Sequence, residues 1–359
     1  MEKIKIVHIS ETFVTGVYTY IRQVSSYSES NGNFKTYIIY SGERNETDEN
    51  LIKKDFSSEA VMININMTRE ISFFKDIKAL FRIIRQIRKI KPDVIHTHSS
   101  KAGVLGRVAA AFYPKAKLFY TPHSYSFIRN DISESKKKFY RYVEKIITKL
   151  FGGTIIAIGD HEYEEARKIG KAVLIRNGVN INFVSQFKKD LSNPKLTIGT
   201  SGRIYRQKNP ELFNQIALSM PDYNFVWIGD GDLKAALTAP NIRVTGWSTY
   251  EQTLNAVGGL DIFISTSSWE GLPFNIIEAM ALSKPIISSD IEGNKVTVNE
   301  NENGFICATA DDFVNGIKKL ENPALRDQFG KESFAIANNI FNLDKNIVDI
   351  INVYSAPKN

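Results

Sequence analysis

The chain has 359 residues, of which 43% are hydrophobic and 24% are charged, and its net charge is +7. This length and composition are ordinary for a globular protein of two domains. The sequence contains one cysteine, Cys307, which excludes an internal disulfide and suits a reducing compartment. No apolar run approaches the ~20 residues of a membrane span, and residues 1–10 predict a first strand rather than a signal peptide. We therefore expect a cytoplasmic protein.

The charge is distributed unevenly along the chain. Residues 1–190 carry 32 Lys and Arg against 20 Asp and Glu, a net charge of +12, whereas residues 191–359 carry 14 against 19, a net charge of −5. A basic half joined to an acidic half predicts different partners for each half.

Along the first half, short β-branched runs alternate with segments of helical periodicity. Strands are predicted at 4–10, 36–41, 61–66, 94–98, 118–122, 154–159 and 172–177. Helices are predicted at 17–30, 71–91, 101–112, 134–151 and 160–169.

The second half repeats this alternation. Strands are predicted at 196–202, 224–229, 242–245, 261–266, 285–289 and 304–307. Helices are predicted at 210–219, 250–257 and 274–283, and then from about residue 310 to the end.

This β–α repetition predicts an α/β fold with parallel sheets covered by helices on both faces. The polar segment 183–194, which ends in Ser192-Asn193-Pro194, is the expected linker. We predict an N-terminal domain over residues 1–185, a C-terminal domain over 195–340 and a final helix within 341–359. Because ligands bind at the carboxyl ends of strands in open parallel sheets, the turns after the strands should hold the site.

In the first half, three of these turns or strand ends carry candidate residues. Gly16 opens a helix, where its backbone can approach a phosphate or a sugar, although a plain tight turn explains it equally well. His96 and His98 point the same way from one strand, but no Cys, Asp or Glu follows at a metal-ligand spacing, so we favour packing or a polar wall over a metal site. His123 can donate a hydrogen bond to a sugar hydroxyl or hold a leaving phosphate, and a solvated loop histidine is the alternative.

In the second half, Gly202 and the cations Arg203 and Lys208 lie between a strand end and a helix start. Arg supplies a planar fork and Lys a point charge, which together suit the clamping of a pyrophosphate. An ordinary charged loop is the alternative. The segment Asp230-Gly231-Asp232 suggests a metal bound to nucleotide phosphates, but a turn after a buried strand requires Gly and Asp for backbone reasons alone, and we favour the turn.

Residues 268–281, Ser-Trp-Glu-Gly-Leu-Pro-Phe-Asn-Ile-Ile-Glu-Ala-Met-Ala, place two glutamates on either side of a Gly-Leu-Pro turn. The backbone N–H groups near Phe274, Asn275 and Ile276 are expected to be free to bind phosphate oxygens at the start of a helix. Glu278, about one turn into this helix, can accept two hydrogen bonds from a ribose diol, and Glu270 faces the far end of such a ligand. Helix capping and dipole pairing account for one glutamate but not for both.

The segment from Glu270 to Glu278 resembles the E-x7-E motif of retaining glycosyltransferases with the GT-B fold, the large family 4 class. The supporting matches occur in the family's order along the whole chain: Gly16, residues 95–106 with 121–123, residues 176–180, Gly202-Arg203 with Lys208-Asn209, Gly229-Asp230-Gly231 and Gly293. Each match is weak alone, and together they are very specific.

This resemblance implies a GT-B fold, in which two Rossmann-like parallel-sheet domains face each other across a cleft and the last helix crosses back to the N-terminal domain. It implies that Arg203 and Lys208 contact the diphosphate of a nucleotide-sugar donor, Glu278 its ribose and Glu270 the transferred sugar, while His123 lies against that sugar. The donor-binding set is then Gly16, Gly202, Gly229, Phe274, Asn275, Ile276 and Glu278. Catalysis with retention of anomeric configuration would need neither a metal nor another cofactor, because these cations and amides stabilise the leaving diphosphate.

The sequence departs from the family pattern at two positions. The family often has Gly-Gly after the first strand, where this chain has Thr15-Gly16, which affects the acceptor-side loop. The family often has Glu a few residues after the glycine that matches Gly293, where this chain has Val296, which affects one donor contact.

We expect a UDP-sugar donor, a saccharide or polyprenyl-linked acceptor and a role in bacterial surface polysaccharide synthesis. The basic helices at 71–91 and 136–151 combine cations with aromatics, which predicts either a solvated basic face or peripheral docking on the anionic inner face of the membrane. Nucleic acid is a poor alternative, because no recognition module is present. A nucleotide-sugar epimerase and an inactive sugar-nucleotide-binding protein are the rival functions. A dehydrogenase is excluded, because this chain has no Gly-x-Gly-x-x-Gly after its first strand.

Overall fold

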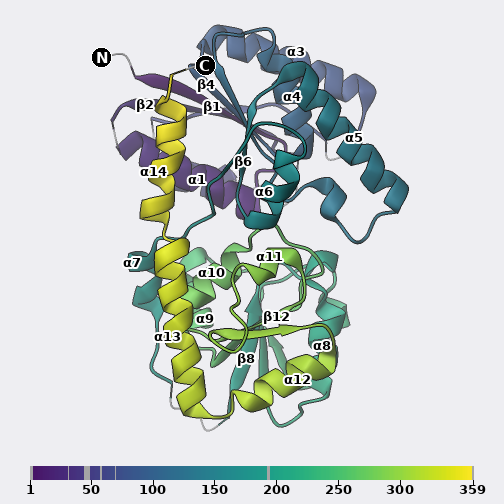
Figure 1. The fold of residues 1–359 in the computed structure, drawn as a ribbon, viewed down its shortest axis with the longest axis vertical. Coiled ribbons are helices and arrows are strands. Elements are labelled where there is room, and N and C mark those ends of the chain that lie inside the picture. The colour runs from purple at the N-terminus through teal and green to yellow at the C-terminus, as the bar shows by residue number, and fades with distance from the viewer. Residues whose placement is uncertain are drawn as a thin grey trace. The chain divides into compact units, whose positions relative to one another are not determined.

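The computed structural model describes residues 3–30, 32–43, 49–56, 59–68, 70–191 and 195–357. The chain forms two compact units, Met1–Arg176 with Ile347–Asn359, and Asn177–Asn346. Each unit is a parallel sheet with helices packed on it, which confirms the predicted α/β fold of two Rossmann-like domains (Figure 1).

The structure divides the chain ahead of the predicted linker, between Arg176 and Asn177. Residues 183–187 of that linker are helical, in α7 (Ile181–Val184) and the 3-10 helix η2 (Ser185–Phe187). Residues 192–194 lie outside the described part of the chain. The end of the chain, Ile347–Asn359, belongs to the first unit.

The sheet of the first unit has seven parallel strands in the order β3-β2-β1-β4-β5-β6-β7. Its strands are β1 (Ile4–Ser10), β2 (Phe34–Tyr40), β3 (Val61–Asn64), β4 (Val94–His98), β5 (Lys117–Thr121), β6 (Thr154–Ala157) and β7 (Ala172–Leu174). The order reverses between β1 and β4, so the carboxyl ends of these two strands flank the position where such sheets bind ligands.

The helices of the first unit are α1 (Thr15–Ser30), α2 (Glu49–Asp55), α3 (Phe73–Ile90), α4 (Ser100–Ala110), α5 (Glu134–Phe151), α6 (Asp160–Arg167) and most of α14 (Leu343–Ser355), with the 3-10 helix η1 (Ser126–Ile128). Helix α5 has the predicted bounds because both of its ends carry caps. The Ser133 side chain accepts from the N–H of Lys136, and Gly152 at φ 67° ends the helix. No described helix is long and apolar enough to cross a membrane.

The sheet of the second unit has six parallel strands in the order β10-β9-β8-β11-β12-β13. Its strands are β8 (Thr197–Ser201), β9 (Asn224–Ile228), β10 (Ile242–Val244), β11 (Ile262–Ser265), β12 (Ile286–Ser289) and β13 (Gly304–Cys307). Its remaining helices are α8 (Pro210–Leu218), α9 (Tyr250–Gly258), α10 (Phe274–Ala281), α11 (Glu292–Lys295), α12 (Ala310–Lys319) and α13 (Pro323–Ile340), with the 3-10 helices η3 (Arg206–Lys208) and η4 (Lys234–Ala236). Here the order reverses between β8 and β11.

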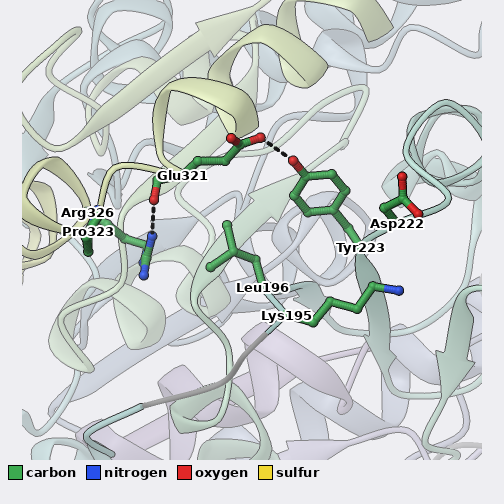
Figure 2. A pocket seen from close by; sticks show the side chains of 7 residues that line it. All are labelled: Lys195, Leu196, Asp222, Tyr223, Glu321, Pro323 and Arg326. Carbon is green, nitrogen blue, oxygen red and sulfur yellow. Dashed lines mark hydrogen bonds between the residues drawn. The ribbon is translucent and has the colours of Figure 1, made fainter.

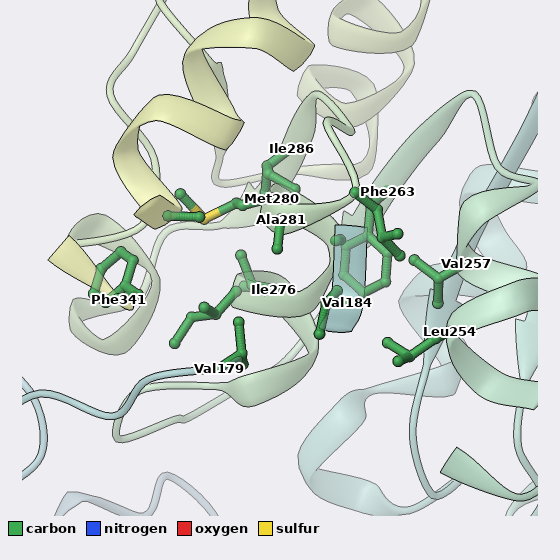
Figure 3. Packing of buried hydrophobic residues seen from close by; sticks show 14 of the residues in the cluster. Val179, Val184, Leu254, Val257, Phe263, Ile276, Met280, Ala281, Ile286 and Phe341 are labelled. Carbon is green, nitrogen blue, oxygen red and sulfur yellow. The ribbon is translucent and has the colours of Figure 1, made fainter. Parts of the chain in front are cut away.

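Helix α10 is fixed by its apolar side chains. Ile276 and Met280 are fully buried among Phe263 of β11, Val179 and Phe341 (Figure 3). Burial of one such side chain stabilises the fold by about 2 kcal/mol. The first turn of α10 is therefore held firmly at the carboxyl edge of the sheet.

Candidate active site

The polar turns of the second unit follow the two strands at its switch point. The turn after β8 contains Gly202, Arg203 and Lys208, and the turn after β11 leads through Glu270 into α10. A backbone hydrogen bond joins the two turns, since the N–H of Ser268 donates to the carbonyl of Gln207 at 2.8 Å. Sequence segments that are about 60 residues apart thus meet at one sheet edge, as the parallel order requires.

Two glycines allow the turns after β8 and β9 to pack closely. Gly202 has φ 134° and Gly229 has φ 142°, a backbone conformation that favours glycine. A Cβ on Gly229 would lie 2.2 Å from the carbonyl oxygen of Gly202. The N–H of Ile204 also donates to the carbonyl of Asp230 at 2.8 Å, so the start of the Arg203–Lys208 turn is anchored.

Glu270 is held by three donors. Its Oε1 is 2.7 Å from Lys208 Nζ and 2.9 Å from Ser267 Oγ, and its Oε2 accepts from Gln207 Nε2 at 3.2 Å. The side chains of Lys208 and Glu270 are 19% and 11% exposed. The structure therefore brings together two predicted site residues and adds Ser267 and Gln207, which sequence analysis missed because neutral polar residues in a turn carry no distinctive spacing.

The first turn of α10 corrects one prediction. The N–H of Ile276 is not free, because it donates to Oδ1 of Asn275 at 3.1 Å. Asn275 also donates from Nδ2 to the carbonyl of Ser201 at 2.7 Å, and its Oδ1 lies 3.5 Å from Lys208 Nζ. Asn275 thus ties α10 to the end of β8 with its side chain, a role that the sequence did not indicate. Phe274 begins the helix beside it, after Pro273.

Glu278 and Arg203 are two further predicted donor contacts of the second unit. Glu278 is buried in the second turn of α10. Arg203 forms an ion pair with Asp232 at 2.7 Å and lies over the ring of Tyr205, 5.0 Å from its centroid. Since Asp232 is 68% exposed, this pair contributes at most about 1 kcal/mol and can yield to a stronger anion.

Two motif residues that support the resemblance acquire physical roles in the structure. The Asn177 side chain donates to the carbonyl of Leu272 at 3.2 Å and so holds the Gly-Leu-Pro turn. A Cβ on Gly293 would lie 2.3 Å from the carbonyl oxygen of Glu270. Glycine at 293 therefore allows α11 to support the turn that carries Glu270. Val296, where the family often has Glu, packs against the apolar core.

Asp230 and Asp232 make the contacts of a charged turn. Asp230 accepts from the N–H of Gly231 at 2.8 Å and pairs with Lys234 at 3.3 Å, while Asp232 pairs with Arg203. The N–H of Gly231 lowers the pKa of Asp230. The turn interpretation accounts for both carboxylates.

The remaining predicted residues belong to the first unit. Gly16 lies within α1, and its neighbour Thr15 has φ 50°, a left-handed conformation that is unfavourable for a β-branched residue. His123 and Ser124 have φ 53° and 77°. The N–H of Ser124 donates to Oε2 of the buried Glu162 at 2.6 Å, and burial raises the pKa of this carboxyl to about 7. Sequence analysis missed Glu162, which appears there as an ordinary helix residue.

The second unit also has a hollow of about 440 Å³ between β8, β9 and α13 (Figure 2). Lys195, Leu196 and Tyr223 of its lining precede β8 and β9, so the hollow lies at the amino ends of the strands. Arg326 in its wall donates to the carbonyl of Leu320 at 2.7 Å and thereby caps α12. Because the polar site residues gather at the opposite, carboxyl ends, we assign the hollow a structural role.

Comparison with known proteins identifies the family. The model of Glycosyltransferase Family 4 matches residues 14–183, and that of Glycosyl transferases group 1 matches residues 183–335. The Escherichia coli UDP-Gal:alpha-D-GlcNAc-diphosphoundecaprenol alpha-1,3-galactosyltransferase is 29% identical over 321 residues, which cover 80% of this chain and 81% of that protein. The Staphylococcus aureus capsular polysaccharide biosynthesis glycosyltransferase CapM is 26% identical over 77% of this chain and 80% of that protein.

A solved structure agrees with this likeness at the level of the fold. Anabaena HepE in complex with UDP and glucose superposes with a TM-score of 0.81, covers 99% of this chain and 100% of that chain, and is 16% identical. The two units, their switch-point turns and the two family matches lead to one conclusion. The chain belongs to the group 1 glycosyl transferases of family 4, has their GT-B fold and is a glycosyltransferase.

Proposed function

We propose that this enzyme transfers a sugar from a UDP-sugar to a polyprenyl-diphosphate-linked saccharide, with retention of anomeric configuration, in the synthesis of a bacterial surface polysaccharide. One observation carries the proposal most directly. Lys208, Glu270 and Asn275 form a contiguous group at the first turn of α10, at the switch point of the second sheet. The names of the Escherichia coli and Staphylococcus aureus relatives support the acceptor class and the pathway. UDP and glucose in the HepE structure support the donor class.

The site offers charges of the sign that each part of such a donor requires. Lys208 and Arg203 supply positive charge for the diphosphate. The first backbone N–H groups of α10 lie at the N-terminus of the helix, which is the end at which helices bind phosphate. We assign Glu278 to the ribose diol and Glu270 to the hydroxyls of the sugar. The ammonium group of Lys208 has three N–H donors. It can therefore retain its ion pair with Glu270 while it donates another hydrogen bond to a phosphate oxygen.

In the proposed reaction, the bond between the anomeric carbon and the diphosphate oxygen breaks as the acceptor hydroxyl attacks from the same face. The hydroxyl proton moves to the departing diphosphate, so no protein nucleophile is required. Arg203, Lys208 and the helix amides stabilise the negative charge that develops on the leaving group. This mechanism needs no metal and no other cofactor.

The function is tested by transfer of radiolabelled sugar from a panel of UDP-, GDP- and dTDP-sugars to GlcNAc linked to a prenyl diphosphate, with EDTA present. We expect a product with one UDP-sugar, and NMR of this product should show the anomeric configuration of the donor. An inverted configuration would contradict the proposed mechanism. Conversion of the nucleotide-sugar without an acceptor would favour an epimerase, and tight donor binding without turnover would favour an inactive binding protein.

We further propose that the enzyme is cytoplasmic and docks on the inner face of the membrane through α3. Phe73, Phe74 and Phe81 of this helix are 70%, 84% and 67% exposed. The exposed cations Lys75, Lys78, Arg82, Arg85, Arg88 and Lys89 lie on the same helix. Exposed aromatics interspersed with cations suit the interface of an anionic bilayer. Phe139 and Tyr142 of α5 extend this character within the first unit.

Co-sedimentation with phosphatidylglycerol vesicles tests the docking. We expect binding that falls with salt and that the double substitution Phe74→Ser with Phe81→Ser reduces at least tenfold. Leu218→Ser, which removes a 54% exposed apolar side chain from the second unit, is the matched control and should bind as the wild type does. Equal binding of neutral and anionic vesicles, or of all variants, would contradict the docking.

A further inference from the structure

Three histidines of the first unit form a hydrogen-bonded chain. His8 lies on β1, His98 on β4 and His123 in the turn after β5. Nδ1 of His8 is 2.9 Å from Nε2 of His98, and Nδ1 of His98 is 3.1 Å from Nε2 of His123. His8 and His98 are fully buried and His123 is half-buried, so the chain runs outward from the sheet to a predicted site residue.

The three rings are neutral at physiological pH. Burial lowers the pKa of both His8 and His123 to about 3, and burial together with the neighbouring histidines lowers that of His98. A neutral imidazole has one N–H donor and one lone pair. Since both nitrogens of His98 are hydrogen-bonded to other rings, one must donate and the other must accept. The two hydrogen bonds therefore point in the same direction along the chain.

The far end of the chain decides this direction. Nε2 of His8 is buried and has no hydrogen-bond partner within the part of the chain that the structure describes. If the hydrogen bonds run inward from His123, this nitrogen is a buried N–H without an acceptor. If they run outward from His8, it is a buried lone pair without a donor. Buried N–H groups without partners are rarer in proteins than under-satisfied acceptors, so the outward direction is favoured.

We propose that His8 and His98 are positioning residues that fix His123 as the tautomer protonated at Nδ1. In this arrangement Nε2 of His123 accepts from His98, and its Nδ1–H is the one ring donor left for a ligand. The inference deepens the proposed function and rests on it, together with the assignment of His123 to the transferred sugar that the family resemblance implies. Such a donor selects an acceptor atom, and a hydroxyl oxygen of the sugar is the group that this assignment supplies.

The backbone and the neighbouring rings hold His123 against His98. Positive φ angles at His123 and Ser124 are costly for residues other than glycine and persist only where the surroundings enforce them. Here the carboxylate of Glu162 binds the N–H of Ser124, and the ring of Tyr20 meets that of His123 edge-on at 4.9 Å. The strained turn thus places Nε2 of the ring toward the sheet.

A metal ion is the alternative explanation of these rings. His8, His96 and His98 offer nitrogens that lie within 4.8 Å of one another. However, Nδ1 of His96 is 2.5 Å from the hydroxyl of Tyr354, and its Nε2 is 2.8 Å from Oγ1 of Thr121. An ion bound by all three rings would have to replace one of these hydrogen bonds of His96 and one of the two hydrogen bonds of His98. Hydrogen bonding therefore explains the cluster with fewer changes.

The test is long-range ¹H–¹⁵N NMR of the full chain labelled at histidine, which reports the tautomer of each ring without substrate. We expect His123 to be protonated at Nδ1 in the wild type. His98→Phe should abolish this signature, whereas His98→Asn, which keeps an N–H near the position of Nδ1, should retain it. His161→Gln is the control, because His161 lies outside the chain of hydrogen bonds. If His98→Phe does not fold, His98→Leu, which also removes both ring nitrogens, takes its place.

Protonation of His123 at Nε2 in the wild type would overturn the proposal, as would an unchanged signature in the apolar variant of His98 that is used. One equivalent of tightly bound metal in the purified protein would also overturn it. With an active donor, kcat/KM should fall about tenfold in His98→Phe, the equivalent of one hydrogen bond, and stay near the wild-type value in His98→Asn. If the tautomer is as expected but no sugar is transferred, the proposed function fails and the positioning inference stands.

Discussion

In the candidate site, Lys208 and Glu270 form an ion pair that should contribute little to the stability of the fold. Their contact of 2.7 Å is partly exposed, and Glu270 keeps Ser267 and Gln207 as donors when Lys208 is absent. Substitution of Lys208 should therefore change the free energy of unfolding by no more than about 1 kcal/mol. The larger effect is expected on the transition state of transfer.

We predict that Lys208→Met lowers kcat by about 10²–10³-fold, because it removes one preorganised cation from the leaving diphosphate. Lys234→Met, which removes a 52% exposed cation from the same unit, is the control and should retain activity. Steady-state kinetics with the active donor measure both. Equal activity of the two variants would show that Lys208 does not contact the diphosphate.

Thr15 occupies a position where the backbone favours glycine. Its φ of 50° is strained for a β-branched residue, and the corresponding family position is often glycine. Thr15→Gly should raise the free energy of unfolding by about 1 kcal/mol. The substitution relieves backbone strain in the folded state, and this gain exceeds the entropy that glycine adds to the unfolded chain. Ser26→Gly, at an exposed position inside α1, should instead lower it by roughly 0.5–1 kcal/mol. Urea titration distinguishes the two, and destabilisation by both would contradict the account.

Glu162 should make the stability of the first unit depend on pH. Burial raises its folded-state pKa from 4.5 to about 7, so the folded state binds more protons than the unfolded state between these values. This contribution to stability is complete below pH 4.5 and is lost as the pH rises through 7. The loss amounts to roughly 3 kcal/mol, and Glu162→Gln should remove it. Denaturation at pH 5 and pH 7.5 gives the difference in free energy of unfolding between the wild type and Glu162→Gln. If Glu162 titrates normally, this difference should be the same at both pH values.

At the level of elements, close packing of turns is as important as the charges that they carry. Gly229→Ala places a methyl group against the carbonyl of Gly202 and imposes an unfavourable φ, so it should cost at least about 2 kcal/mol. Gly246→Ala is the matched control, because Gly246 has φ 79° but its nearest neighbour would be 3.8 Å away. It should cost only about 1 kcal/mol, and thermal denaturation compares the two.

The sequence was sufficient to predict most elements of the fold, and it singled out the turns that meet at the candidate site. The alternation of strands and helices indicated the α/β class, and the helix predicted at 134–151 has the bounds of α5. The short helices α2, α7 and α11 were missed, because four to seven residues contain too little periodicity to be recognised. Contacts such as Asn177 with Leu272, 95 residues apart, could not be predicted because they depend on tertiary packing.

Within the candidate site, the charged residues were predictable and their partners were not. Arg203, Lys208 and Glu270 stand out because a parallel sheet gathers strand ends at one edge. Asn275 was expected to contribute only its backbone N–H, but its side chain also accepts a hydrogen bond from the N–H of Ile276. The local geometry of the helix start decides this, and the sequence carries no signal for it.

At the level of the whole molecule, the end of the chain completes the first unit. Ile347, Ile350 and Tyr354 of α14 are buried, and Lys117 donates to the carbonyl of Ala356 at 2.7 Å. A chain that ends at residue 346 should therefore lose the folded first unit while the second unit, Asn177–Asn346, remains folded. Hydrogen exchange should show protection in the second unit only. Tyr354→Phe, which removes one hydroxyl, should keep both units folded, and full protection of the shortened chain would contradict this role of α14.

We propose above all that the switch point of the second sheet binds a nucleotide-sugar without a metal. The most direct test is thermal denaturation with a panel of nucleotide-sugars in EDTA, for the wild type and Glu278→Ala. At 100 times its dissociation constant, a donor that binds only the folded state stabilises it by about 2.7 kcal/mol. We predict a shift with a UDP-sugar in the wild type and its loss in Glu278→Ala. A shift that requires a divalent cation, an equal shift in the variant, or no shift with any donor would show that this site does not bind the donor as proposed.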